Sequence, residues 1–472
     1  MTKTLLGSLR EYKKGSILTI LLSVLEAAFE ILIPLRMADL IDQGIEPGEM
    51  AAVWKFGTII LVFAALQLLT GVLSAHVAAK TSVGFSANLR QDMYDNVQTF
   101  AFSNIDKFST ASIVTTDVTN LQNAYQMLIR MAVRGPVMLI FSMIVSFRIN
   151  TTLALIFLAV IPIMAVLLLL IIRKVGPLFG RVFRTYDTLN NVVQENVRGI
   201  RVVKSFNQED HAIKKFKGIS QSIYEDFAAG ERLLAFNSPI MQFFMYACMI
   251  LISWIGAKAV VASGNSAALG MTTGDLTALF SYATQILMAL MMLSMVFAMI
   301  TISLASAHRI AEVLEEKTDI ANPTGAEMTV RDGSIRFEHV NFSYAAKADK
   351  KVLSDIDLSI ASGQTVGIIG GTGSSKSSLV QLIPRLYDVS SGRLLLGGVD
   401  VRKYDLETLR SAVAMVLQKN ELFSGTIKEN LRWGNEAAGD EEMEEACRLA
   451  CADEFIQGFP DKYDTYIEQG GS

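Results

Sequence analysis

Long apolar segments dominate the N-terminal part of the chain. Most of them approach the roughly 20 residues that an α-helix needs to cross the hydrocarbon core of a bilayer. The third is the weakest as an apolar run, because Arg130 and Arg134 stand at its start. The pattern predicts a helical membrane domain over residues 1–318, with these six spans: Ile17–Ala38, Val53–Val77, Gly135–Phe147 with its upstream turns, Leu153–Ile172, Pro239–Ala262 and Leu276–Leu304.

Cationic residues predict the orientation of these spans. They gather at the N-terminus and in the connections after the second and fourth spans, the latter including Arg198, Arg201 and Lys204. The other three connections are short and poor in Lys and Arg. Since cytoplasmic connections carry the excess of these residues, we expect an integral protein of the plasma (inner) membrane with both termini in the cytoplasm. The amphipathic pattern of Asn190–Val197 predicts helices that continue beyond the bilayer.

The pattern changes after Leu304. Ser306–Glu316 predicts a charged amphipathic helix that continues the sixth span, and residues 319–333 predict a linker. Two alternating stretches, within Ile335–Val340 and Val352–Ile360, predict strands. The apolar run Thr365–Ile369 predicts a buried strand, and the run that begins at Ser378 predicts a helix. Residues 334–472 are therefore expected to form an α/β domain.

A glycine-rich loop joins that predicted strand to that predicted helix. Small residues allow successive backbone N–H groups to close around a polyphosphate, while a lysine reaches the β- and γ-phosphates and a serine hydroxyl binds Mg²⁺. Ser375 departs from the strict motif, which has glycine directly before the lysine. The expected phosphate-binding residues are Gly370, Gly371, Thr372, Gly373, Ser374, Ser375, Lys376, Ser377 and Ser378.

Composition excludes several classes of protein. Of 472 residues, 51% are hydrophobic, and the mean hydropathy is +0.37, which is too apolar for a soluble P-loop enzyme. A net charge of −4 gives no indication of a nucleic-acid partner. With three cysteines, no disulfide framework is expected, and with only four histidines scattered along the chain, no metal site is expected.

This organisation resembles the half-transporters of the ATP-binding cassette (ABC) exporters, which have six membrane helices and one nucleotide-binding domain. Val340–Tyr344 resembles the aromatic loop of that family, and Val416–Gln418 resembles its glutamine loop. Gln194–Phe206 and Ala305–Ile310 are similar to its cytoplasmic segments. The resemblance implies ATP and Mg²⁺ as cofactors, stacking of Tyr344 on adenine, and Ser377 and Gln418 as the residues on the metal.

The resemblance also implies a mechanism. Two nucleotide-binding domains close around two ATP molecules, so a second half-transporter is required, in a homodimer or a heterodimer. The expected function is ATP-driven export of a hydrophobic or amphipathic small molecule, such as a drug, a lipid or a peptide. By this resemblance, residues 334–472 would form an incomplete α/β P-loop nucleotide-binding domain. No catalytic residue of the family is matched, because the chain ends at Ser472, before the signature motif and the catalytic glutamate. We therefore expect no ATP hydrolysis by this chain alone. A non-catalytic subunit that supports a complete partner and an inactive truncated product both stay open.

Two features bear on the substrate. Glu26 and Glu30 share one face of the first predicted helix, where they either bind a cationic substrate or face a wet cavity or the interface. On the sixth helix, methionines recur at helical spacing, and they form either an adaptable face for apolar substrates or ordinary helix packing. These are Met288, Met292, Met295 and Met299.

Overall fold

The computed structural model describes residues 2–105, 113–266, 268, 270–344, 351–418 and 420–468. The chain divides into two compact units. The helical unit comprises Met1–Phe100 and Asn104–Thr318, and the α/β unit comprises Ala101–Ser103 and Asp319–Ser472.

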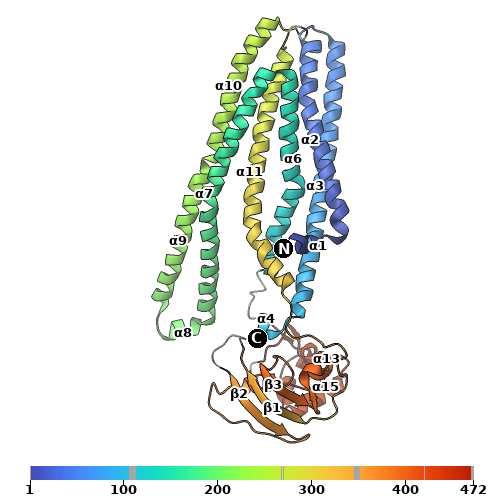
Figure 1. The fold of residues 1–472 in the computed structure, drawn as a ribbon, viewed down its shortest axis with the longest axis vertical. Helices are drawn as coiled ribbons and strands as arrows, with labels where there is room; N and C mark the ends of the chain where they lie inside the picture. Colours follow the sequence, from blue (N-terminus) through green and yellow to red (C-terminus); the bar gives the residue numbers. More distant parts are fainter. Residues whose placement is uncertain are drawn as a thin grey trace. The chain divides into compact units, whose positions relative to one another are not determined.

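Long helices build the helical unit (Figure 1). The six predicted spans are confirmed, because six helical segments have a length and composition that can cross a membrane. The helices and short turns are α1 (Thr2–Gly7), η1 (Arg10–Tyr12), α2 (Lys13–Leu40), η2 (Ile41–Ile45), α3 (Met50–Gln98), α4 (Phe102–Ile105, whose first two residues belong to the α/β unit), η3 (Ile113–Asp117), α6 (Val118–Ile149), α7 (Thr151–Arg198), α8 (Ile200–Ser205), α9 (Glu209–Ala235), α10 (Asn237–Ser263) and α11 (Thr273–Glu315).

Several helices extend well beyond the predicted apolar runs. α3 has 49 residues and α7 has 48, so each is about 70 Å long at the rise of an α-helix. The polar end of α3 is supported by packing on α6 and α11. Leu89 and Met93 of α3, Val118 of α6 and Ile310 of α11 are buried in one cluster. The predicted continuation of the sixth span through Ser306–Glu316 is confirmed up to Glu315.

Local chemistry fixes where the helices begin and end on the side of the short connections. Thr272 and Asp275 form a capping box at the start of α11, in which each side chain accepts a hydrogen bond from the backbone N–H of the other residue. The Asn150 side chain accepts from the Leu153 N–H at the start of α7. Gly264 ends α10 in a left-handed conformation with φ of 61°.

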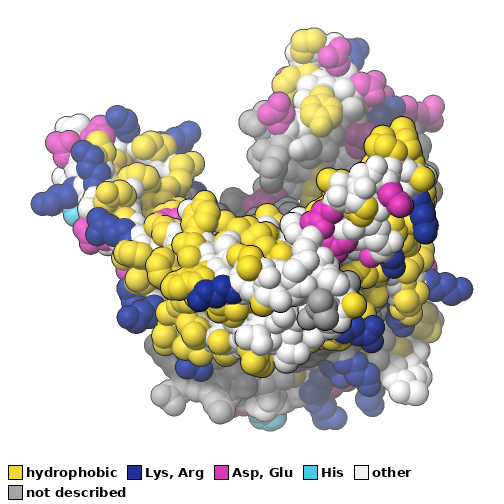
Figure 2. Space-filling view, turned by 90° about the horizontal axis from the view of Figure 1, so that it is seen from above, with side chains coloured by type: hydrophobic (Ala, Val, Ile, Leu, Met, Phe, Trp, Pro, Cys, Tyr) yellow, Lys and Arg dark blue, Asp and Glu magenta, His cyan; other side chains and the backbone are white. Residues whose placement is uncertain are grey.

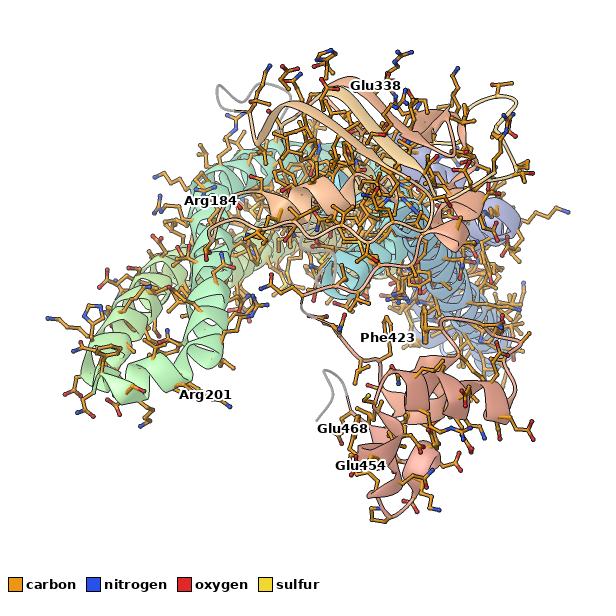
Figure 3. All side chains as sticks on the ribbon, turned by 90° about the horizontal axis from the view of Figure 1, so that it is seen from below. Arg184, Arg201, Glu338, Phe423, Glu454 and Glu468 are labelled. Atoms are coloured by element: carbon orange, nitrogen blue, oxygen red, sulfur yellow. The ribbon has the colours of Figure 1, made fainter. Side chains whose placement is uncertain are left out.

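Apolar side chains cover much of the face of the protein shown in Figure 2. Leu61, Leu68 and Val261 are among the large hydrophobic residues that remain exposed on the helices. Exposed apolar surface of this extent on long helices is expected where lipid is the solvent. By contrast, α7 and α9 form an arm with cationic residues, and Figure 3 shows Arg184 on α7 and Arg201 at its α8 end.

The α/β unit contains a four-stranded sheet in the order β2-β1-β3-β4, whose neighbours are all antiparallel. Phe337 lies opposite Leu358 of β2 and Leu394 of β3. The strands and helices are β1 (Ile335–Phe342), β2 (Leu353–Ile360), α12 (Lys376–Gln381), β3 (Ser391–Leu396), β4 (Val399–Asp400), η4 (Val401–Lys403), α13 (Leu406–Ala412), β5 (Gly425–Thr426), α14 (Ile427–Leu431), α15 (Asp440–Leu449), α16 (Asp453–Gln457), η5 (Lys462–Asp464) and β6 (Tyr466–Ile467).

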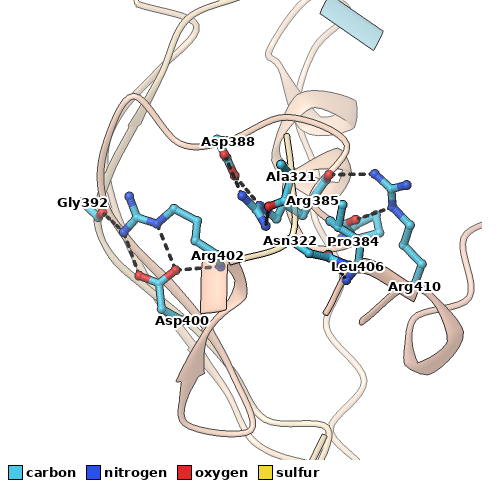
Figure 4. Close-up of polar contacts among 10 residues, drawn as sticks. All are labelled: Ala321, Asn322, Pro384, Arg385, Asp388, Gly392, Asp400, Arg402, Leu406 and Arg410. Atoms are coloured by element: carbon cyan, nitrogen blue, oxygen red, sulfur yellow. Dashed lines mark hydrogen bonds and ion pairs between the residues drawn. The ribbon is translucent and has the colours of Figure 1, made fainter. Parts of the chain in front are cut away.

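Polar contacts attach the segment before β1 to this unit (Figure 4). The Arg385 guanidinium binds Asp388 and donates to the Ala321 carbonyl, at 2.8 and 3.4 Å. The Asn322 amide donates to the Asp405 carboxylate, and its side-chain oxygen accepts from the Leu406 N–H. Asn322 thus provides an acceptor for a backbone N–H at the start of α13, while Ala321 is held by Arg385.

One predicted element is wrong. Thr365–Ile369 is not a strand, and its residues are exposed, with Ile369 98% exposed. A strand that is buried in a parallel sheet needs hydrogen-bonded neighbours and covered faces. Within the described residues, no strand lies beside this segment, and the sheet formed by β1–β4 is antiparallel. Apolar composition alone therefore did not determine the conformation of this segment.

Candidate nucleotide-binding site

The glycine-rich loop lies between β2 and α12 and is anchored by the helix that follows it. Leu379 and Leu382 pack with Phe337, Phe342 and other residues in the core of the sheet, so α12 is fixed on that core. The helix begins at Lys376, close to the predicted start. Gly370, Gly371, Thr372, Gly373 and Ser374 all lie exposed ahead of it. The loop is thus an accessible segment on a rigid support.

Lys376 folds back over the loop. Its Nζ donates hydrogen bonds to the carbonyls of Gly370 and Gly371, at 2.8 and 2.9 Å, and to Ser374 Oγ, at 3.2 Å. These acceptors are neutral and exposed. A polyphosphate would be a far stronger partner for the ammonium group, because hydrogen bonds between charged groups are about twice as strong as neutral ones. The Lys376 ammonium is thus held over the loop by acceptors that a phosphate group would outcompete.

Glycine is favoured at particular positions of the loop. A Cβ at Gly370 would lie 2.6 Å from Ser374 Oγ, so a side chain there would require the serine side chain to move. Gly373 has φ of 83°, which favours glycine. Ser375 also has a positive φ, of 62°, and is left-handed directly before α12. The departure from the strict motif therefore places an L side chain where glycine is preferred.

Tyr344 follows β1 and reaches α12. Its hydroxyl lies 2.7 Å from Ser378 Oγ and donates to Gln381 Oε1 at 3.4 Å. The ring packs edge-on against Phe342 and Tyr387, with centroids 4.8 and 5.1 Å apart. Tyr344 is still 51% exposed, so part of the ring is available to a planar ligand. The structure thus brings Tyr344 and Ser378 together.

The glutamine predicted for the metal is placed differently. Gln418 lies in an exposed bend after the extended segment Val413–Leu417, and Ser377 is exposed on the first turn of α12. In the part of the chain that the structure describes, no hydrogen bond joins Gln418 to Ser377 or to the loop. Their shared role on Mg²⁺ therefore stays a prediction.

Sequence reasoning missed two residues beside Tyr344. Tyr387 packs on its ring, and Gln381 accepts from its hydroxyl. Gln381 lies three residues after Ser378 on α12, so helical spacing could have indicated it. Tyr387 follows the helix in an irregular segment, and only the tertiary fold brings it to β1.

Comparison with known families agrees with this geometry. Residues 353–467, which contain the loop and α12, match the model of the family described as ABC transporter. Residues 16–291, more than half of the chain, match the model described as ABC transporter transmembrane region. The chain belongs to the ABC transporter family.

Individual ABC transporters are similar to this chain over nearly its whole length. An uncharacterized ABC transporter ATP-binding protein of Bacillus subtilis, YfiB, is 34% identical over 99% of this chain and 80% of its own length. One from Mycobacterium tuberculosis is 32% identical over 98% of this chain and 79% of its own length. The fatty acid ABC transporter ATP-binding/permease protein of Mycobacterium bovis is 33% identical over 81% of this chain and 60% of its own length. The protein is an integral membrane transporter of the exporter type with an ATP-binding domain.

A second polar cluster lies on the sheet of the ABC transporter. His339 Nδ1 is 2.8 Å from Asp355 Oδ1 and 3.2 Å from Asp357 Oδ2, and these three exposed side chains could hold a metal ion. The hydrogen bond to Asp355, together with the charges of Asp357 and Asp355, raises the pKa of His339 above its ordinary value of 6.5. The contact is therefore strongest as an ion pair with protonated histidine.

Proposed function

We propose that this chain is half of a dimeric ABC exporter that uses ATP to move a hydrophobic or amphipathic small molecule across the membrane. The observation that supports this most is the position of Lys376, within a glycine loop that matches the ABC transporter model. Residues 1–318 would form the membrane domain, 319–333 the linker and 334–472 the nucleotide-binding part.

Each site residue has a proposed role. The backbone N–H groups from Gly370 to Lys376 would hold the phosphates, with the Lys376 ammonium on the β- and γ-phosphates. Ser377 and Gln418 would bind Mg²⁺, and the exposed part of the Tyr344 ring would stack on adenine. ATP supplies the free energy of transport. This chain would contribute nucleotide binding, orientation and sensing, and a second half-transporter, identical or different, would complete the assembly.

The membrane and the direction of insertion follow from charge. The Lys and Arg residues in the long connections support an orientation with both termini in the cytoplasm, and the proposed location is the plasma membrane. For the substrate, the relative named as a fatty acid transporter supports an amphipathic molecule among the classes of drug, lipid and peptide. A non-catalytic nucleotide-binding subunit is the second candidate, and Ser375 with its positive φ favours it, because a strained loop binds nucleotide weakly.

Nucleotide binding tests the proposal. We would titrate the full chain in detergent with a fluorescent ATP analogue and Mg²⁺. The Lys376→Ala variant is expected to lose affinity at least about tenfold, because a charge-assisted contact to phosphate is removed. Lys403→Ala, an exposed lysine of the same unit in η4, is the matched control and should retain the affinity. Equal affinities of the wild type and Lys376→Ala would contradict the proposed site.

A further inference from the structure

Four charged side chains meet between α2 and α6, and we refer to them as the charge cluster. Arg134 binds both carboxylates of α2, with 3.0 Å from Nη1 to Glu26 Oε1 and 2.5 Å from Nη2 to Glu30 Oε2. Arg130 Nη2 lies 3.9 Å from Glu26 Oε1. Because both carboxylates are already paired, they are not a free anionic site that would select a simple cation.

The charge cluster lies at the depth of the membrane. Glu26 and Glu30 are near the middle of α2, within the candidate span Arg10–Ile45. Charged side chains at this depth are costly, and they are retained mainly on substrate pathways or in pairs with one another. Two carboxylates and two guanidinium groups give the cluster no net formal charge.

The charge cluster nevertheless has unused hydrogen-bonding capacity. Glu26 Oε2 and Arg134 Nε are buried and have no hydrogen-bond partner among the described residues. Among the described residues, Arg130 has one polar contact, at 3.9 Å with Glu26, and its side chain is 26% exposed. Buried polar atoms without partners are costly, so this arrangement favours a ligand that satisfies them. The cluster offers one acceptor, on Glu26, and several donors, on Arg130 and Arg134.

Neighbouring helices hold the charge cluster in place. A Cβ at Gly71 of α3 would lie 3.1 Å from Glu26 Oε1, so the carboxylate fits closely under that glycine. Gln285 of α11 donates to the Glu30 carbonyl at 3.4 Å and accepts from Ser142 of α6 at 3.2 Å. Side chains of the cluster are thus positioned by α2, α3, α6 and α11 together, and Glu26 is only 7% exposed.

We propose that the charge cluster binds the zwitterionic headgroup of an amphipath. An ammonium group would donate to Glu26 Oε2, and a phosphate or carboxylate would accept from Arg130 and from Arg134 Nε. Guanidinium groups suit such planar or tetrahedral anions. A zwitterion adds no net charge to a neutral cluster, whereas a simple anion or cation would add an uncompensated charge at membrane depth. This inference rests on the proposed function, since it specifies the headgroup of the amphipathic substrate.

Two phospholipids with equal charges test the proposal. A primary ammonium donates hydrogen bonds, but the quaternary ammonium of choline does not. We would titrate the full chain in detergent with dioleoyl phosphatidylethanolamine and with dioleoyl phosphatidylcholine. Native mass spectrometry, which releases the complexes from their micelles, would measure the bound lipid. The ethanolamine lipid should bind about tenfold more tightly, as expected for a hydrogen bond to a charged group. Equal affinity for the two lipids in the wild type would overturn the proposal without any variant.

Variants assign the preference to the charge cluster. Glu26→Gln should reduce the preference for ethanolamine to below about threefold, because the amide accepts a weaker hydrogen bond. Arg130→Gln should weaken both lipids about tenfold and leave the preference in place. Arg148→Gln, in the last turn of the same helix, is the matched control and should resemble the wild type. Full retention of the preference in Glu26→Gln would also overturn the proposal.

Two further measurements identify the source of the headgroup and distinguish a failure of the charge-cluster proposal from a failure of the proposed ATP-driven function. Preference for ethanolamine in the diacyl series alone supports a bilayer phospholipid as the ligand. Preference also in single-chain lysophospholipids supports a released amphipath. The fluorescent ATP analogue is titrated on the same samples. If nucleotide binds while the headgroup preference is absent, only the charge-cluster proposal fails. If the preference is present while nucleotide does not bind, only the proposed ATP-driven function fails.

Discussion

The hydroxyl of Tyr344 lies 2.7 Å from Ser378 Oγ, so the segment after β1 is bonded to the helix that follows the glycine loop. Ser378 is itself buried at the edge of the core, beside Leu379. Two parts of the proposed nucleotide site, the base-stacking ring and the phosphate loop, therefore share one support. A change at the tyrosine can act either through its ring or through this hydrogen bond.

Substitutions at Tyr344 separate these two effects. In Tyr344→Phe the ring remains, so affinity for a fluorescent ATP analogue should fall by no more than about threefold, the cost of one exposed hydrogen bond. In Tyr344→Ala the stacking surface is lost, and affinity should fall about tenfold or more. A larger loss in Tyr344→Phe than in Tyr344→Ala would contradict stacking. Phe455→Ala, an exposed aromatic residue on α16, controls for general destabilisation.

Ser375→Gly should strengthen the loop. At φ of 62° an L residue is strained by about 1 kcal/mol relative to glycine, although glycine is more flexible in the unfolded chain. We expect a several-fold gain in affinity for the ATP analogue and a small rise in Tm. Both are measurable by titration and thermal unfolding of the full chain.

Ser374→Gly is the matched control for that gain. Ser374 is adjacent, and it is not among the described residues with positive φ. Its replacement adds flexibility and removes an acceptor of Lys376, so affinity should stay equal or fall. If both glycine variants bind nucleotide with the same increase in affinity, backbone strain at Ser375 is not the cause.

The sequence predicts the elements whose burial pattern is local. The six spans are confirmed because their apolar runs are long. β1 and β2 are confirmed as strands, although a register shift between Phe337 and Val340 interrupts the alternation of buried and exposed residues in β1. Thr365–Ile369 is equally apolar but has no strand beside it among the described residues, so the prediction of a strand is wrong. A property that depends on neighbours distant in sequence is not encoded in a run of five residues.

The candidate site also contains residues that a local motif predicts and residues that only tertiary packing brings together. Lys376 and the glycines are identified by a local motif, and the structure brings Lys376 to the loop carbonyls. The sequence predicts part of the charge cluster, because helical spacing places Glu26 and Glu30 on one face of a helix. Their pairing with Arg134 depends on the packing of α2 on α6 and could not be predicted. Roles of the site residues, including Gln418, stay predictions for binding experiments.

Removal of the Asp117 carboxylate should destabilise the helical unit. Asp117 is buried at the junction of η3 and α6, where it accepts from Ser306 at 2.7 Å and from Arg309 Nε and Nη2 at 2.8 and 2.5 Å. Asp117→Asn keeps the shape but loses the charge-assisted bonds, at a cost of about 2 kcal/mol. The measurement is Tm of the full chain in detergent at a fixed scan rate, which should fall by several degrees.

An exposed pair gives the matched comparison. Arg432 and Asp440 form an ion pair with side chains that are 39% and 58% exposed. Arg432→Gln should lower stability by less than about 1 kcal/mol, because water screens such pairs. An equal loss of Tm in Arg432→Gln and Asp117→Asn would show that burial of the Asp117 contacts has no special weight.

The contact of His339 with Asp355 predicts that the stability of the α/β unit depends on pH. Because the folded pKa of His339 is raised, the protonated histidine stabilises the fold fully below pH 6.5, its ordinary value, and this contribution is lost as pH rises through the higher folded pKa. Tm of the full chain should therefore decline modestly from pH 6 upward, since the pair is exposed. His339→Gln should flatten that part of the profile, whereas His211→Gln, on α9, should not. Identical pH profiles of the wild type and His339→Gln would contradict an ion pair at this position.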